Sequence, residues 1–223
     1  MGFLEAVRRK LIVSCQALPE EPLHSSFVMG KMALAAKQGG AAAIRAQGTQ
    51  DIREIRKVTG LPVIGLIKRS YADSEIYITP TLREVEELLT TGCEMIALDM
   101  TERVRPGGIA AELLVKKIQE NGTLVLADIS TYEEGKKAAM LGADAVSTTL
   151  SGYTSYSPQQ EGPDFALVES LARDLSLPVF AEGRIQTPEE MKKAMDAGAY
   201  APIIGSAITR PQLITAGFSA MLK

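Results

Sequence analysis

The chain has few of the side chains that most metal and nucleophilic centres need. It contains one histidine, His24, and two cysteines, Cys15 and Cys93, among 223 residues. A lone histidine in a loop is usually structural, and it argues against a histidine-rich zinc site or a conventional Ser-His-Asp triad. Both cysteines lie in apolar runs, where a free thiol behaves as a small buried side chain. We therefore predict a protein of a reducing compartment, the cytoplasm.

The chain also lacks an excess of basic residues and any long apolar run. Its 24 Lys and Arg against 27 Asp and Glu give a net charge of -3, so nucleic acid is not an expected partner. No run approaches the ~20 apolar residues of a membrane span. The apolar part of 8–18 is too short and too interrupted for a signal peptide. We expect a protein that handles a small molecule, without nucleic acid or membrane.

One unit recurs along the whole chain: a short apolar strand, a polar joint and an amphipathic helix. Strands that alternate with helices indicate a parallel sheet. Several helix candidates begin at threonines that can cap free amides and end at a glycine, as at Gly92, Gly142 and Gly198. The eight strand candidates begin at Leu11, Ala41, Pro62, Met95, Leu124, Ala145, Pro178 and Pro202.

Eight such units predict an α/β fold, a single (β/α)8 TIM barrel over residues 1–223. A doubly wound open sheet is the alternative. It normally has fewer strands or a dinucleotide fingerprint, and no G-x-G-x-x-G follows a strand here. No linker or low-complexity segment marks a domain boundary.

Barrel enzymes carry their active sites at the carboxyl ends of the strands, where this chain places Lys68. Period-2 alternation puts Lys68 on the same strand face as Ile64 and Leu66. Apolar neighbours disfavour the charged amine and move its pKa toward neutrality, so Lys68 could be a base or a Schiff-base nucleophile. It could equally pack its stem on the rim with its head in water.

Glu182 ends the seventh strand and would project over the barrel mouth opposite the third strand. There it could face Lys68 across a substrate, and an acid and a base on two sides of a carbon suit proton transfer. It could instead only neutralise Arg184 or Lys68. Other polar residues near strand ends are Gln16, Arg45, Gln47, Arg69, Asp99, Asp128, Ser130, Thr148, Thr149 and Arg184.

Small residues follow the seventh and eighth strands. The backbone amides of Gly183, Gly205, Ser206 and Ala207 can approach an anion closely, and barrels often bind phosphate at this place. Arg210 could add a charged fork to the phosphate or cap its own loop. The glycines could also only turn the chain. We favour a phosphate site.

Two features carry weaker signals. Tyr153 and Tyr156 lie in the longest loop of the predicted rim, which could form a lid over a substrate or an exposed turn. Asp99 and Asp128 could hold Mg²⁺ between them. Strand-end aspartates more often orient substrate hydroxyls or pair with Lys or Arg, and no carboxylate cluster is present. We predict no metal site.

Nine segments follow one another at barrel-compatible spacing: "LIVSCQALPEEPLHS", "GGAAAIRAQG", "PVIGLIKR", "EIYITPT", "ALD", "ADIST", "VSTTLSGYT", "AEGRI" and "GSAITRP". In this order they resemble the N-acetylmannosamine-6-phosphate 2-epimerase family over nearly the whole chain. The resemblance implies a cofactor-independent isomerase of amino sugar phosphates. It would interconvert N-acetylmannosamine 6-phosphate and N-acetylglucosamine 6-phosphate through C2 of the ring-opened sugar, in sialic acid degradation.

The resemblance also implies residue roles. Lys68 would remove the C2 proton, and Glu182 would assist ring opening and proton movement. Arg210 and the glycine loops would clamp the phosphate, although Ser206 stands where the family motif "GGAIT" has a second glycine. A serine hydroxyl could still donate to phosphate. The implied sugar contacts are Gln16, Arg45 and Asp128.

Two other functions stay open. The protein could be an aldolase-like lyase that uses a Schiff base on Lys68, or a sensor that binds a sugar phosphate without catalysis. In each case the expected partner is a small sugar phosphate. A homodimer formed through a barrel end or the outer helices is compatible with the fold.

Overall fold

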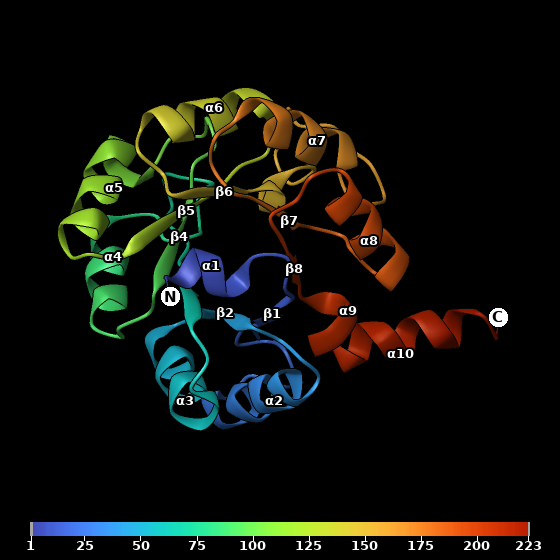
Figure 1. The fold of residues 1–223 in the computed structure, drawn as a ribbon. Coiled ribbons are helices and arrows are strands. Elements are labelled where there is room, and N and C mark those ends of the chain that lie inside the picture. The colour runs from blue at the N-terminus through green and yellow to red at the C-terminus, as the bar shows by residue number, and fades with distance from the viewer. Residues whose placement is uncertain (1, 223) are drawn as a thin grey trace.

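The computed structural model describes residues 2–222, which form a closed barrel of eight parallel strands (Figure 1). Neighbouring strands pair in sequence order, and β8 pairs with β1 to close the barrel. The strands are β1 (Ile12–Cys15), β2 (Ala43–Gln47), β3 (Val63–Leu66), β4 (Met95–Asp99), β5 (Leu124–Asp128), β6 (Ala145–Ser147), β7 (Val179–Glu182) and β8 (Ala201–Ile204). The predicted TIM barrel is confirmed.

Helices alternate with the strands and surround the barrel (Figure 1). The α-helices are α1 (Phe3–Val7), α2 (Ser26–Gln38), α3 (Thr49–Thr59), α4 (Leu82–Leu89), α5 (Ala111–Glu120), α6 (Tyr132–Met140), α7 (Phe165–Asp174), α8 (Pro188–Asp196), α9 (Ser206–Thr209) and α10 (Pro211–Ala220). Two short 3₁₀ helices are η1 (Pro106–Gly108) and η2 (Thr148–Leu150). None of the helices described for residues 2–222 could cross a membrane.

The helix ends show why the sequence forms these elements. Helices α4, α6 and α8 each begin with a capping box, in which a threonine and a glutamate three residues later satisfy each other's amides. In α4 the capping residue is Thr81, directly after the Thr79-Pro80 pair. The glycines after these helices adopt positive φ angles of 68°, 89° and 100° (Gly92, Gly142 and Gly198).

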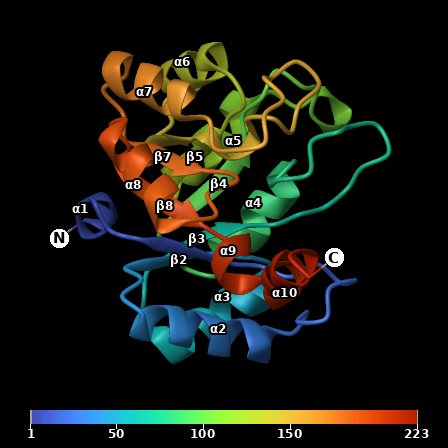
Figure 2. The ribbon, with the colours of Figure 1, turned by 90° about the vertical axis from the view of Figure 1, so that its right-hand side faces the viewer.

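Side-chain alternation along the strands determines which residues face the inside of the barrel. Inward-facing apolar residues such as Ile64, Leu66 and Phe180 form one buried cluster inside the barrel. Val7 of α1 joins this cluster, so α1 closes the amino-terminal end of the barrel. Figure 2 shows α1 at one end and the long loop after β3 at the other. The polar residues that follow at the carboxyl end of the inner face include Ser14, Arg45, Lys68, Asp128, Ser147 and Glu182.

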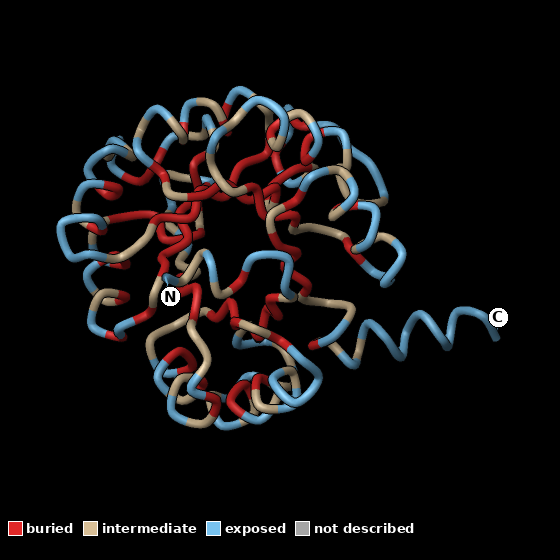
Figure 3. Tube along the Cα trace, viewed as in Figure 1, coloured by how far each residue is buried: buried red, intermediate tan, exposed pale blue. Residues whose placement is uncertain are grey.

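Helix α10 departs from the barrel pattern. It projects from the wall instead of packing on it, and none of its residues is buried (Figures 1 and 3). Phe218 of this helix and Leu222, just after it, are 77% and 90% exposed. The chain therefore presents an apolar helix that its own barrel does not cover.

Candidate active site

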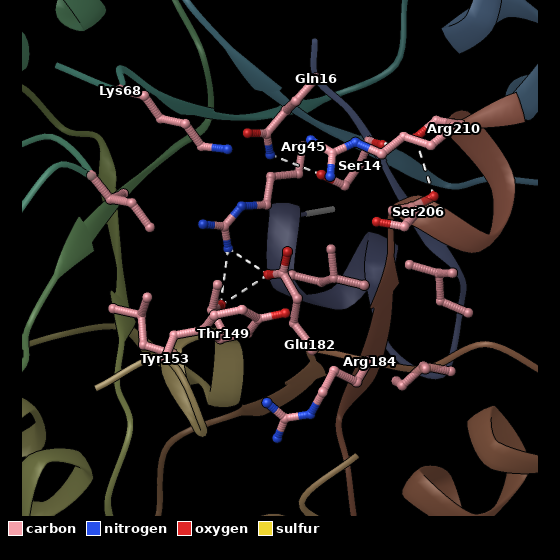
Figure 4. Close-up of a pocket in the computed structure, with 18 of the residues that line it drawn as sticks. Ser14, Gln16, Arg45, Lys68, Thr149, Tyr153, Glu182, Arg184, Ser206 and Arg210 are labelled. Atoms are coloured by element: carbon pink, nitrogen blue, oxygen red, sulfur yellow. Dashed lines mark hydrogen bonds and ion pairs between the residues drawn. The ribbon is translucent and has the colours of Figure 1, made fainter. Parts of the chain in front are cut away.

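A cavity of about 250 Å³ opens at the carboxyl ends of the strands (Figure 4). Its position agrees with the rule that barrel active sites lie at this rim. Of the predicted site residues, Ala207 and Asp128 do not line it. Those that do are Gln16, Arg45, Lys68, Tyr153, Glu182, Gly183, Arg184, Gly205, Ser206 and Arg210.

Arg45 forms the charged floor of the cavity. It is 1% exposed, and its Nη1 and Nη2 donate to Asp128 Oδ1 and Oδ2 at 2.9 Å and 2.5 Å. Nη1 also donates to Glu182 Oε2 at 2.5 Å. Burial disfavours the charged guanidinium, but the two carboxylates outweigh burial and raise the pKa of Arg45. Arg45 is therefore a fixed positive charge, and Asp128 lies buried behind it.

The pKa of Glu182 is subject to two opposing influences. Burial raises its pKa, the charge of Asp128 adds to this effect, and Arg45 lowers it, with a net rise above the ordinary value. The side chain remains partly accessible, at 13% exposure. A carboxyl group in this state can exchange a proton closer to neutral pH than a free glutamate can.

Lys68 points into the same cavity from the strand-three side (Figure 4). Its backbone forms an antiparallel bridge with Ile78, where the loop after β3 folds back. Among residues 2–222 the Lys68 amine has no hydrogen-bond partner. Burial, followed by the positive charges of Arg45 and Arg210, lowers the pKa of Lys68 to about 8. A useful fraction of this amine is neutral near physiological pH.

The β7 and β8 end of the cavity is built from small residues. Gly183 has a φ of 109°, which favours glycine, and a Cβ on Gly205 would lie 3.3 Å from Ser14 Cβ. Arg210 borders this region and is held by Glu21, through Nε to Oε1 and Nη2 to Oε2, each at 3.0 Å. This leaves Nη1 of Arg210 as the nitrogen without a bond to Glu21.

Arg184 has its guanidinium directed away from the cavity (Figure 4). Its Nε donates to the Gly162 carbonyl and its Nη1 to the Ser151 carbonyl, both at 2.8 Å. It also lies 5.5 Å from the centre of the Tyr153 ring. Arg184 thus anchors the 151–162 loop and places Tyr153 at the rim, where Tyr153 is 56% exposed.

Sequence reasoning missed several lining residues. Ser14 stands at a strand end, so the rim rule could have assigned it to the site. The rule did place Thr149 near a strand end, but sequence reasoning assigned Thr149 no role. Tyr77 lies where the loop after β3 folds back toward the barrel, and no hydrophobic periodicity in the sequence predicts that the loop folds back. Residues 2–222 contain no group of three or more His, Cys, Asp and Glu side chains arranged to hold a metal.

The fold and this cavity define a (β/α)8-barrel protein with a polar, anion-compatible site at its carboxyl-terminal rim. A family model described as "Putative N-acetylmannosamine-6-phosphate epimerase" matches residues 29–223. The chain belongs to this N-acetylmannosamine-6-phosphate epimerase family. The resemblance predicted from the sequence is confirmed.

Curated relatives and solved structures agree with this assignment. Two relatives described as "Putative N-acetylmannosamine-6-phosphate 2-epimerase" are each 63% identical to this chain. The one from Clostridioides difficile (strain 630) matches over 97% of both chains. The one from Clostridium perfringens (strain 13 / Type A) covers 99% of this chain and 100% of its own. The solved N-acetylmannosamine-6-phosphate 2-epimerase from Clostridium perfringens has a TM-score of 0.98 at 62% identity, covering 99% of this chain and 96% of that one.

A more distant structure shares only the fold. Thiamine phosphate pyrophosphorylase from Pyrococcus furiosus has a TM-score of 0.61 at 15% identity, covering 93% of this chain and 91% of that one. Fold alone does not fix a reaction, so the functional argument depends on the site and the family.

Proposed function

We propose that this protein interconverts N-acetylmannosamine 6-phosphate and N-acetylglucosamine 6-phosphate, as a cytoplasmic step of sialic acid breakdown. The observation that carries the proposal is the meeting of Lys68 and Glu182 in one cavity that also has an anion-compatible end. The family assignment supplies the substrate class. Both cysteines are free and buried, which agrees with a reducing compartment.

The acidity of the substrate identifies C2 as the carbon at which the reaction occurs. The C2 proton of an amino sugar becomes acidic only after the ring opens and exposes the C1 aldehyde. Lys68, as a neutral amine, takes that proton, and a proton returned to the opposite face of C2, by Lys68 itself or by Glu182, inverts the centre. Glu182 also moves protons during ring opening. Positive charge beside the developing enolate stabilises it, a contribution of order 3 kcal/mol per donor, and Arg45 is the nearby fixed cation.

The remaining predicted contacts divide by their place in the cavity. Gln16 and Tyr153 border it and would contact the sugar. Asp128 would act through Arg45, since it lies behind the guanidinium. The phosphate would bind at Gly183, Gly205, Ser206 and the free nitrogen of Arg210, with Ala207 supporting the loop. Binding energy from this remote group then orients C2 toward Lys68.

The direct test is an assay with the two hexosamine phosphates, followed by ¹H NMR. We expect each sugar phosphate to be converted into a mixture of both, with no added cofactor. Binding without interconversion would favour a sensor. Release of a shorter carbon chain would favour an aldolase-like lyase.

We also propose that two copies of the chain associate through α10. Residues 211–222 carry no charged side chain, and no residue of α10 is buried. A ten-residue helix is marginal in water unless an apolar face packs against a partner. Two-fold symmetry would let the same helix be covered on both chains.

Phe218→Glu is expected to convert a dimer into a monomer, because it places a charge on the exposed apolar face of α10. Sedimentation velocity at micromolar concentration measures the change. Met140→Glu, at a 78% exposed position on α6, is the matched control and should leave the dimer intact. A wild-type chain that sediments as a monomer would contradict the assembly.

A further inference from the structure

The hydrogen bonds of Glu182 fall on one of its two carboxylate oxygens. Oε2 accepts from Arg45 Nη1 at 2.5 Å, from Thr149 Oγ1 at 3.0 Å and from Ser147 Oγ at 3.4 Å. Among residues 2–222, Oε1 has no hydrogen-bond partner. Figure 4 shows this second oxygen turned away from the Arg45 and Thr149 donors. Oε1 is therefore the oxygen available for proton exchange.

Thr149 lies at the centre of this arrangement. Its Oγ1 is 2.7 Å from Asp128 Oδ1 and 2.8 Å from Ser147 Oγ, in addition to its contact with Glu182. A hydroxyl has one proton to donate, so at any moment Thr149 donates to only one of Asp128, Glu182 and Ser147. Ser147 in turn donates either to Thr149 or to Glu182. The two hydroxyls can thus satisfy Oε2 in more than one orientation.

The local fold fixes both hydroxyls next to the Glu182 carboxylate, Thr149 at the cavity and Ser147 buried beneath it. Strand β6 ends at Ser147, and η2 begins at Thr148, which donates to the Glu182 carbonyl at 2.9 Å and accepts from the Glu182 amide at 3.2 Å. The backbone of Glu182 is therefore tied to Thr148. Its carboxylate is tied to the residues on either side of Thr148.

We propose that Thr149 is a positioning residue for Glu182: with Ser147 it forms a hydroxyl pair that holds Oε2, directs Oε1 into the cavity and reorients when Glu182 gains or loses a proton. This inference rests on the proposed function only where it assigns the proton of Glu182 to the opening of the sugar ring. Thr149 contacts Glu182 and acts on the reaction through it, not through a contact with C2 of the sugar.

The charges around Glu182 give the sign of the expected effect. Arg45 from β2, Asp128 from β5 and Lys68 after β3 face it. Burial and Asp128 raise the pKa of Glu182, whereas Arg45, the Thr149 hydrogen bond and Lys68 lower it. Thr149→Val removes the hydroxyl at nearly constant shape. Glu182 should then hold its proton to higher pH.

The test is a pH titration of the Glu182 side-chain carboxyl by ¹³C NMR in glutamate-labelled protein, with the signal assigned by its loss in Glu182→Gln. In Thr149→Val the midpoint should move to higher pH. In Thr149→Ser, which keeps the hydroxyl, it should return to the wild-type value. Thr91→Val is the matched control, because it removes a buried hydroxyl that donates to the Leu88 carbonyl far from the site.

Folded Thr149→Val that titrates at the wild-type pH would overturn the proposal, as would an equal shift in Thr91→Val. Kinetics give a second readout. The positioning role predicts a loss of roughly tenfold in kcat with little change in KM, smaller than the ~10²–10⁴-fold loss expected when an acid–base group itself is removed. If the wild-type chain fails to epimerise the sugar phosphates, the proposed function fails, while the NMR titration still decides the role of Thr149.

Discussion

Replacement of Lys68 by alanine is expected to reduce epimerisation by ~10³-fold or more while the barrel remains folded. The amine is the group that would take the C2 proton, and its burial near Arg45 and Arg210 lowers its pKa to about 8. Lys68 is partly desolvated and lies near the cations Arg45 and Arg210, so removing its charge should not destabilise the fold. Steady-state kinetics and a thermal melt of the same sample measure both parts of the prediction.

Lys57→Ala provides the comparison for Lys68→Ala. Lys57 lies on α3 with its side chain 77% exposed, so its loss should leave activity and melting temperature unchanged. Retained epimerisation in Lys68→Ala would remove the proposed base. Trapping of substrate on wild-type Lys68 by borohydride would instead assign it to a Schiff-base reaction.

Arg45→Met is expected to destabilise the fold by roughly 3–5 kcal/mol at neutral pH, because it leaves buried carboxylates without their cation. Arg45 is 1% exposed and Asp128 is fully buried. Arg45 is the main group that holds the pKa of Glu182 down, so without the guanidinium the Glu182 carboxyl binds a proton more tightly in the folded state than in the unfolded state. The loss relative to wild type should therefore grow as pH rises and be smallest in acid. Urea unfolding at several pH values measures this dependence.

Two variants sharpen the Arg45 experiment. Arg56→Met breaks an ion pair with Glu94 whose side chains are each 33% exposed, and it should cost about 1 kcal/mol or less. Arg45→Met combined with Asp128→Asn removes both members of the buried pair and should recover part of the lost stability. A loss in Arg45→Met no larger than that in Arg56→Met would mean that the buried pair does not support the fold.

The barrel was predictable from the sequence because each strand and helix carries its own local signal. Apolar strands, threonine caps and terminal glycines such as Gly92 each depend on residues close by in the chain. Seven strands begin at the predicted start or at most two residues after it, and β8 begins one residue before its predicted start, at Ala201. Helix α10 is different. In a (β/α)8 barrel the helix that follows β8 is expected to pack on the outside of the barrel, but that packing depends on distant surfaces that the local sequence pattern does not encode.

The site was predictable only in part. The rim rule brought Lys68 and Glu182 to one cavity, because residues at the carboxyl ends of parallel strands converge. It could not reveal that Arg184 turns away to hold the 151–162 loop, since that depends on carbonyls brought close by tertiary structure. Nor could it place Tyr77, which reaches the cavity on the returning arm of a loop.

Hydrogen exchange at C2 tests most directly whether Lys68 removes a proton from carbon. N-acetylmannosamine 6-phosphate is incubated with the protein in D2O across neutral and alkaline pH, and deuterium at C2 is followed by NMR. The account predicts deuterium at C2 of both product and recovered substrate, at a rate that rises with pH and levels above about 8, because only the neutral amine accepts a proton. Product that forms without deuterium at C2, or exchange that persists in Lys68→Ala, would contradict it.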